Sequence, residues 1–234
     1  MAKRSDGFIT EKRILQVCVR LFLEQGYHKT KTSQILENAR VSCSSFQNLF
    51  HNKEGVLMEL VEFMFENQFG IAKDAAGTEL PQVYVYATET ALQITLTELN
   101  ENLRDIYLEA YTCPDTLAYI QRVTAKELRD IFQSYQPELD EQDFLELEYG
   151  TGGLMRGYMT NPCTAEFTLE RKLSKFITAS LRVYNVPEDE IAKVLAFIEG
   201  LDIRSLAQSV MDELFRRLAM YYEFSLEGLL PQEN

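Results

Sequence analysis

Apolar residues recur every three to four positions along almost the whole chain of 234 residues, whereas the alternation typical of β-strands is hard to find. This spacing predicts an all-α protein. Near the N-terminus we expect a helix that Thr10 caps and Gly26 ends, followed by two short helices over residues 32–39 and 43–50.

Polar residues mark the starts of the next two helices. Ser42 is a good N-cap for the second short helix, and Asn52 is a good N-cap for the longer helix that follows. Within the second short helix we expect the apolar residues Phe46, Leu49 and Phe50 to face the core.

Longer amphipathic helices are expected in the rest of the chain. We place them at about residues 80–101, 103–112, 115–136, 140–160, 164–184, 187–199 and 202–224. The architecture that follows is an N-terminal three-helix helix-turn-helix domain and a larger C-terminal helical bundle. We set their boundaries at residues 1–55 and 56–234.

The formal net charge of −13 argues, taken alone, against a nucleic acid or an anionic membrane as partner. The charge is unevenly distributed, however. Residues 1–55 contain nine Lys or Arg and five Asp or Glu, a net of +4, and the remainder carries −17. The basic N-terminal segment is therefore suited to a polyanion, which the acidic remainder repels.

Several other classes are excluded. No apolar run approaches the ~18 residues of a membrane helix, and no apolar segment follows the basic N-terminus as in a secretory signal. The four cysteines and two histidines are too far apart for a zinc site. We therefore expect a cytoplasmic protein with reduced thiols and no cofactor. Because neither histidine has a Ser or Cys partner at motif spacing, an enzyme is the least favoured class.

Two short helices joined by a tight turn after a longer helix form a helix-turn-helix unit, whose second short helix lies in the major groove of DNA. Small and polar residues there allow close approach and hydrogen bonds to base edges. Residues at the start of the first short helix suit a phosphate. The candidate DNA contacts are Lys3 and Arg4 on a loose N-terminal arm, Thr30, Lys31, Thr32, Ser42, Cys43, Ser44, Ser45, Gln47, Asn48, His51 and Lys53.

The run from Thr10 to Leu57 resembles the N-terminal domain of the tetracycline-repressor (TetR) family of bacterial transcription regulators. The residues that match, in order and without gaps, are Ile14, Leu15, Leu21, Phe22, Gly26, Tyr27, Thr30, Ile35, Ala39, Val41, Ser42, Phe50, Lys53 and Leu57. The resemblance implies a homodimer whose N-terminal domains bind a palindromic operator in double-stranded DNA. It also implies that the C-terminal domains bind a small-molecule effector, which releases what is by default a repressor.

Four departures from the family pattern bear on DNA binding. Arg40 occupies a turn position where the family usually has Gly, and a left-handed backbone there would cost Arg roughly 1 kcal/mol. Gln47 and Leu49 replace common aromatic residues, and Ser44 replaces Gly or Ala. The alternative function is therefore a helical interaction or ligand-binding protein with weakened DNA binding.

The stretch from Tyr149 to Met159 contains four glycines and predicts a helix that another helix or a ligand can approach closely. It lacks the Lys–Ser/Thr ending of a phosphate-binding loop. A cavity between bundle helices is the default ligand site. The candidate ligand contacts are Phe65, Tyr107, Tyr111, Tyr149 and Arg156, and Arg156 fits either an acidic ligand or a salt bridge within the bundle.

The two helices expected over residues 164–184 and 187–199 are candidates for dimerisation, because two helices from each subunit make a four-helix interface. Their apolar stripes consist of Phe167, Leu173, Phe176, Ile177 and Leu181 on the first helix and Ile191, Val194, Leu195 and Ile198 on the second. The alternative is that both stripes pack inside one chain.

Overall fold

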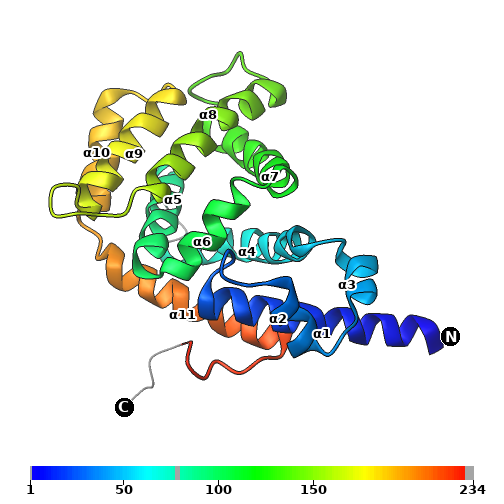
Figure 1. Cartoon of the computed structure of the whole chain (residues 1–234). Helices are drawn as coiled ribbons and strands as arrows, with labels where there is room; N and C mark the ends of the chain where they lie inside the picture. The colour runs from blue at the N-terminus through cyan, green and yellow to red at the C-terminus, as the bar shows by residue number, and fades with distance from the viewer. Residues whose placement is uncertain (1, 77–79, 230–234) are drawn as a thin grey trace.

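The computed structural model describes residues 2–76 and 80–229, with the side chains of residues 7–65 and 80–229. Within the described residues the chain forms eleven helices and no strand, which confirms the all-α prediction (Figure 1). The helices are α1 (Ala2–Gln25), α2 (Thr32–Ala39), α3 (Cys43–Phe50), α4 (Lys53–Ala76), α5 (Gln82–Leu99), α6 (Glu101–Ala110), α7 (Pro114–Phe132), α8 (Glu141–Thr160), α9 (Leu169–Val183), α10 (Glu188–Glu199) and α11 (Ile203–Tyr222).

The helix-turn-helix unit lies at one end of the molecule. Helix α2 packs on α1, and α3 packs on the start of α4. The predicted bounds of α2 and α3 are confirmed, and so is the cap at Asn52, whose side-chain oxygen accepts the backbone N–H of Gly55 at 3.0 Å. The predicted domain boundary after residue 55 falls inside α4 and stays a prediction.

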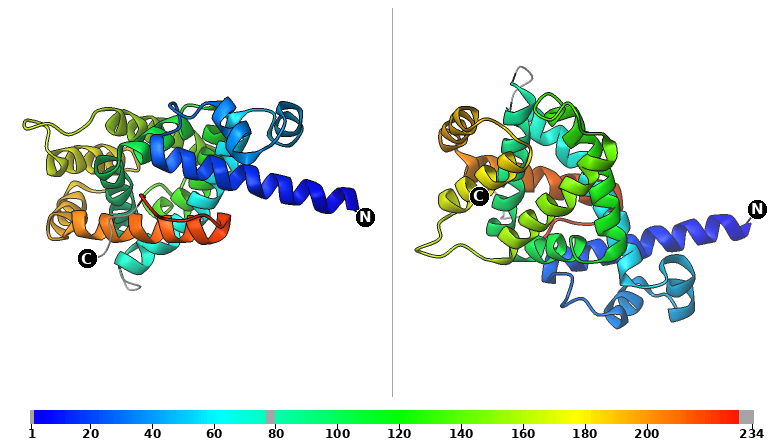
Figure 2. Two further views of the ribbon diagram at one scale, coloured as in Figure 1. Left: turned by 60° about the horizontal axis from the view of Figure 1, so that its bottom comes forward. Right: turned by 90° about the horizontal axis from the view of Figure 1, so that it is seen from above.

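The first helix differs from the prediction at its N-terminus. Helix α1 begins at Ala2, so Thr10 lies within the helix, and Lys3 and Arg4 do not lie on a loose arm. The segment before Thr10 contains no proline, and Gly7 alone does not stop the helix. The N-terminal part of α1 extends beyond the other helices, as the two views of Figure 2 show.

Helix α5 runs through the centre of the C-terminal bundle and contacts α4 and all six helices from α6 to α11. Almost every residue between Val83 and Thr97 is buried, as expected for a helix that is covered on all sides. Its threonine hydroxyls are satisfied within the helix: Thr88 donates to the carbonyl of Tyr84 at 2.8 Å, and Thr95 to that of Ala91 at 2.7 Å. Polar side chains therefore occupy this core without unpaired hydroxyls.

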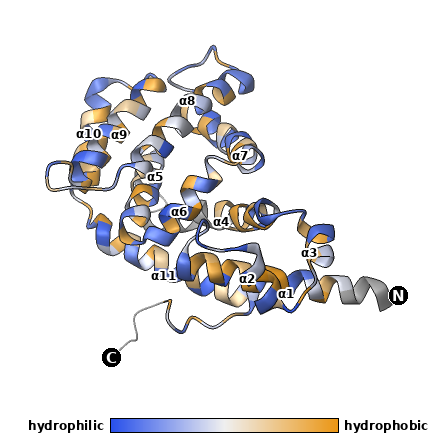
Figure 3. Cartoon of the chain, viewed as in Figure 1, coloured by the Kyte–Doolittle hydropathy of each residue, from blue (hydrophilic) through white to orange (hydrophobic). Residues whose placement is uncertain are grey.

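The outer helices cover α5 from two sides. Helices α7 and α8 pack on each other, and α9 and α10 form a second pair. Polar and apolar positions alternate at helical spacing along these outer helices (Figure 3). The helix that Asp202 was expected to begin is confirmed, because its carboxylate accepts the backbone N–H of Ser205 at 3.2 Å.

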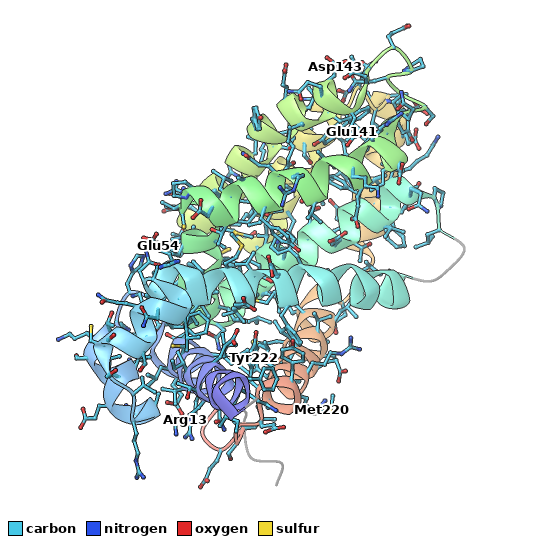
Figure 4. The ribbon with its side chains drawn as sticks, turned by 90° about the vertical axis from the view of Figure 1, so that its right-hand side faces the viewer. Arg13, Glu54, Glu141, Asp143, Met220 and Tyr222 are labelled. Carbon is cyan, nitrogen blue, oxygen red and sulfur yellow. The ribbon has the colours of Figure 1, made fainter. Side chains whose placement is uncertain are left out.

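The last helix packs against the first. Helix α11 packs beside α1, with Tyr222 and Met220 on the part of α11 next to α1 (Figure 4). The ammonium of Lys12 lies 2.6 Å from the carboxylate of Glu223, and the side-chain amide of Gln16 donates to the carbonyl of the same residue. The hydroxyl of Tyr222 donates to the carbonyl of Glu59 in α4 at 3.4 Å.

Candidate nucleic-acid interface and internal cavity

Helix α3 has one buried and one exposed side. Phe46 and Phe50 are buried, and their rings are 6.0 Å apart. The opposite side exposes small and polar side chains, which are Cys43, Ser44, Gln47 and Asn48. Ser42 caps the helix as predicted, because its hydroxyl accepts the backbone N–H of Ser45 at 3.1 Å. The aromatic anchors thus fix the helix while its polar side faces outward.

Leu49 corrects the expectation for this helix. It was predicted to face the core, but 36% of its surface is exposed. Phe46 and Phe50 already occupy the side of α3 that packs on the domain, and Leu49 lies on the flank between them and the polar side.

The start of α2 keeps part of its predicted role. Lys31 and Thr32 are exposed, and the backbone N–H of Lys31 donates to the side chain of Gln34 at 2.8 Å. Thr30, by contrast, is only 1% exposed, and its hydroxyl donates to the carbonyl of Gly26 at 2.7 Å. The predicted phosphate contact from the Thr30 hydroxyl is therefore corrected to a contact that shapes the turn.

Lys53 also turns inward. Its ammonium donates to the carbonyls of Tyr27 at 2.8 Å and Thr30 at 3.0 Å, and lies 3.8 Å from the centre of the Tyr27 ring. Partial burial lowers the pKa of this ammonium from its ordinary value. The residue predicted to bind phosphate thus fastens the α1–α2 loop to the start of α4.

Two residues on the turns have a positive φ angle. Arg40 has φ 50° and ψ 50° at the end of α2, the conformation that a glycine would adopt most easily. His51, at the end of α3, has φ 59° and an exposed side chain. Both side chains are exposed on the surface of the helix-turn-helix unit. The side chains of Lys3 and Arg4 lie outside the described part of the chain.

Helix α6 joins the helix-turn-helix unit to the bundle. The carboxylate of Asp105 accepts the backbone N–H of His28 at 2.8 Å, and the His28 ring lies 3.3 Å from the carboxylate of Glu109. The side-chain amide of Asn102 donates to the carbonyl of Leu23 at 2.9 Å. The end of α1 and the loop after it are thus held by one face of α6.

A narrow cavity of about 50 Å³ lies inside the bundle, between α4, α5, α7, α8 and α9 and next to the end of α6. Four aromatic residues line it: Phe65, Tyr86, Tyr111 and Phe176. Its polar lining includes Glu89, Thr90, Gln93, Glu127, Glu148 and Thr151. The cavity combines apolar walls with a few polar groups, as ligand sites usually do.

The structure brings only part of the predicted ligand set to this cavity. Phe65 and Tyr111 line it, and Tyr107 is buried in the same core. Tyr149 is corrected to a surface position, with 52% of its surface exposed. Arg156 is exposed too, and its guanidinium donates to the hydroxyl of Thr112 at 3.0 Å. Each lies on α8 one residue after a cavity residue, and the 100° rotation per residue takes it to the outside.

The carboxyl groups of the cavity were missing from the prediction. Burial, together with the nearby Glu127, raises the pKa of Glu89 well above its ordinary value. Burial raises the pKa of Glu148 to about 7, against the opposing effect of a hydrogen bond from Thr151. The available sequence signal was a single acidic residue within a long uncharged stretch, as at Glu89 in the middle of α5.

Seven of the nine residues in the predicted dimerisation stripes are core residues of a single chain, and a role of the two helices in dimerisation stays a prediction. All nine except Phe167 and Leu195, which are half-buried, are buried in one protomer: Leu173, Phe176, Ile177, Leu181, Ile191, Val194 and Ile198. Helices α9 and α10 turn these stripes toward α5 and toward each other. A residue that already packs inside its own subunit is unavailable to a partner.

The glycines of α8 face two directions. A side chain at Gly152 would meet the cavity carboxylate of Glu148, with its Cβ 3.0 Å from the oxygen. Cβ atoms at Gly150, Gly153 and Gly157 would meet nothing within 4 Å. The predicted close approach is therefore possible at both sides, toward a ligand at Gly152 and toward another helix at the other three.

Among the described residues no group of three or more His, Cys, Asp or Glu side chains is arranged to hold a metal ion. None of the described helices is both long and apolar enough to cross a membrane.

These features define a helical protein with an exposed helix-turn-helix end and a separate helical bundle. Residues 14–60 match the family described as bacterial regulatory proteins, tetR family. The match covers the helix-turn-helix unit and agrees with the resemblance seen in the sequence.

Two curated relatives share this part of the chain. The uncharacterized HTH-type transcriptional regulator YvkB of Bacillus subtilis (strain 168) is 34% identical over 68 residues, 29% of this chain and 36% of that protein. The regulator YuxN of the same organism, described in the same words, is 27% identical over 59 residues, 25% of this chain and 20% of that protein. The similarity therefore spans about a third or less of either relative.

Two solved structures, both titled as crystal structures of a gamma-butyrolactone receptor (ArpA-like protein), align over 87% of this chain and over 98% and 99% of their own. Their TM-scores are both 0.45, and their sequence identities are 19% and 17%.

Proposed function

We propose that this protein is a dimeric, ligand-responsive regulator that binds a palindromic DNA operator and releases it when a small molecule occupies the internal cavity. The observation that carries this proposal is the polar, exposed side of α3, formed by Ser44, Gln47 and Asn48 above the buried Phe46 and Phe50. A helix that enters the major groove needs this combination of rigid support and exposed hydrogen-bonding groups.

The charge distribution supports the same proposal. The segment of residues 1–55 carries +4 and the remainder −17, so DNA is attracted to the helix-turn-helix end and repelled by the bundle. Glu141 and Asp143 of the acidic bundle lie at the end of the molecule opposite the helix-turn-helix unit (Figure 4). Contact with DNA is thereby restricted to the basic end.

A dimer has to present its two reading helices about 34 Å apart, one turn of DNA. We propose the outer side of α8 as the surface on which two copies meet. Gly150, Gly153 and Gly157 leave open space there, and the exposed Tyr149 lies beside them. Small residues allow two helix backbones to approach closely, and a twofold axis would place the same side of α8 from both copies in contact.

Two helices support coupling between the cavity and the DNA-binding end. Phe65 of α4 lines the cavity, and Lys53 at the start of the same helix holds the α1–α2 loop. Tyr111 at the end of α6 lines the cavity as well, while Asp105 in the middle of α6 holds His28. A ligand that displaces either helix shifts the reading head, and a coupling of about 1–3 kcal/mol changes operator affinity 5- to 150-fold.

Fluorescence anisotropy with labelled DNA from upstream of the protein's own gene tests the proposal. We expect saturable binding that weakens steeply with salt and survives excess non-specific DNA. Gln47→Ala and Asn48→Ala should each weaken binding by roughly tenfold or more. The matched control is Gln142→Ala, an exposed glutamine at the far end of the bundle. No binding at low salt by the folded wild-type dimer would contradict the proposal.

The second candidate is a helical interaction or ligand-binding protein whose helix-turn-helix unit binds DNA weakly. The left-handed Arg40 and the exposed Gln47 in place of an aromatic residue favour it. In this case, anisotropy detects only non-specific DNA binding, which competitor DNA removes, and α3 substitutions change nothing. The same titration therefore distinguishes the two functions.

A further inference from the structure

The cavity is unusual in its charge. Carboxyl groups from three helices line it: Glu89 on α5, Glu127 on α7 and Glu148 on α8. The described residues that line it include no Lys, Arg or His. Three acids in one small cavity without a basic residue point to a ligand that itself brings the positive charge.

Glu89 is the most informative of the three. It is 9% exposed and lines the cavity. Within the described part of the chain, no group donates a hydrogen bond to its carboxyl and no cation pairs with it. A largely buried carboxyl that no protein group pairs with is costly to ionise. Such a group is explained if a ligand supplies the partner.

Glu148 presents a second carboxyl to the same space. One of its oxygens accepts the hydroxyl of Thr151 at 2.7 Å, and that hydroxyl lies 2.7 Å from the hydroxyl of Tyr184. The other oxygen faces Gly152, where the absence of a side chain leaves room beside it. The hydrogen bond fixes one oxygen and leaves the second available to a ligand.

Aromatic rings complete the site. Phe65, Tyr86, Tyr111 and Phe176 come from four different helices or their ends and all line the cavity. The faces of aromatic rings attract cations, and recognition of ammonium groups by aromatic residues with nearby carboxylates is a general solution. The space of about 50 Å³ fits a small head group, and a larger body would have to separate the helices.

We propose that the effector of this regulator is an organic cation, an amine or quaternary ammonium compound, whose charged head lies between Glu89 and Glu148 against the aromatic walls. The inference rests on the proposed function only in naming this cation as the effector, because binding itself requires no DNA. A bulky cation would press on Phe65 of α4, which begins at the DNA-binding end.

The protonation of the site sets the direction of its pH dependence. Tyr86, Tyr107, Tyr111 and Tyr184 face the acids from the surrounding helices, and burial raises the pKa of each above its ordinary value, so they stay neutral. Burial also raises the pKa of Glu127. A bound cation favours the carboxylate form, so binding releases protons and strengthens as the pH rises through about 7, the pKa of Glu148.

Isothermal titration calorimetry on the full chain without DNA tests the proposal. The probes are choline and its neutral isostere 3,3-dimethylbutan-1-ol. The alcohol has a carbon atom where choline has its positively charged nitrogen. One pH unit above the pKa of Glu148, we expect choline to bind at least about tenfold more tightly than the isostere. One unit below that pKa, the difference should shrink.

The variants assign the effect to residues. Glu89→Gln should weaken choline binding at least about tenfold and leave the isostere unchanged. Glu148→Gln should remove the part of the pH dependence that is centred on about 7. The control is Glu146→Gln, an exposed acid on the same helix as Glu148, which should change neither. Thermal melts verify that each variant is folded.

Three results would overturn the inference: equal affinity for the two probes, unchanged choline affinity in Glu89→Gln, or no choline binding up to about 10 mM. Preference for the isostere at low pH would indicate a neutral ligand that accepts hydrogen bonds from protonated acids. Failure of operator binding in the anisotropy assay, with choline still bound, would reject the DNA-binding function and leave the cation site intact.

Discussion

The carboxylate of Asp105 holds the backbone N–H of His28 at 2.8 Å and lies directly against Gly26, where an added Cβ would come within 2.8 Å of the same oxygen. Gly26 has φ 86°, a conformation that only glycine adopts without strain. The join between the helix-turn-helix unit and α6 therefore depends both on a carboxylate and on the absence of a side chain.

Gly26→Ala should lower the free energy of unfolding by more than about 1 kcal/mol, since it adds both backbone strain and a clash with Asp105. Gly228→Ala is the matched control, with φ 82° and nothing within 4 Å of the new Cβ. Urea denaturation measures both. If the contact with Asp105 matters, Asp105→Ala restores part of the loss in the Gly26→Ala protein, and equal losses for the two glycines would reject that contribution.

Replacing Arg40 by glycine should stabilise the protein by a few tenths to about 1 kcal/mol, because it removes the strain of the left-handed backbone. Arg40→Ala is the control, since it removes the guanidinium but keeps a Cβ at the same φ. Chemical denaturation should rank glycine above both arginine and alanine. A glycine variant no more stable than the alanine variant would show that the turn is not strained.

Substitutions at two lysines should distinguish an effect on stability from an effect on DNA binding. Lys53→Met removes the ammonium that two loop carbonyls share, and we expect a loss of about 1–3 kcal/mol in the free energy of unfolding. Lys31→Met, at an exposed position, should change stability by less than about 0.5 kcal/mol. It should instead reduce the slope of log binding constant against log salt concentration by about one, because one phosphate contact is lost. The opposite assignment of effects would contradict the roles given to these two residues.

The pH dependence of stability should report on Glu148. Its pKa in the folded protein, about 7, lies above the ordinary value of 4.5, so its contribution to stability is fully present below that ordinary value and is lost as the pH rises through about 7. Glu148→Gln should remove a loss of at most about 3 kcal/mol across this range. Denaturation at several pH values measures it, with Glu146→Gln as control. Parallel curves for wild type and Glu148→Gln would contradict the prediction.

The proposed dimer surface can be tested at one glycine. Gly153→Leu places a large side chain on the open outer side of α8 and should raise the dimer dissociation constant at least about tenfold. Lys126→Leu, which adds a comparable apolar side chain to an exposed position on α7, is the control. Analytical ultracentrifugation measures both, and an unchanged dimer in Gly153→Leu would exclude this surface.

Local signals predicted most of the helices and caps. Ser42 and Asn52 act as expected because a cap depends on neighbours only two or three residues away. The left-handed turn at Arg40 was likewise predictable, since the helix-turn-helix pattern requires it. The start of α1 was missed because Thr10 offers a cap that a longer helix passes without using.

The cavity was less predictable, because its residues depend on which side of each helix is covered. The prediction named Tyr149, whereas the neighbouring Glu148 lines the cavity, and it named Arg156, whereas Met155 does. The apolar stripes of α9 and α10 posed the same question, since periodicity shows that a side is buried but not whether its own chain or a partner covers it.

The ion pair between Lys12 and Glu223 has a consequence for protein engineering. The first and last helices cover one another, so the helix-turn-helix unit of this protein is not a detachable module. A chimaera that joined residues 1–55 to a foreign sensor would leave the side of α1 that α11 covers open to water. The helix-turn-helix unit can be moved to another protein only if α11 is moved with it.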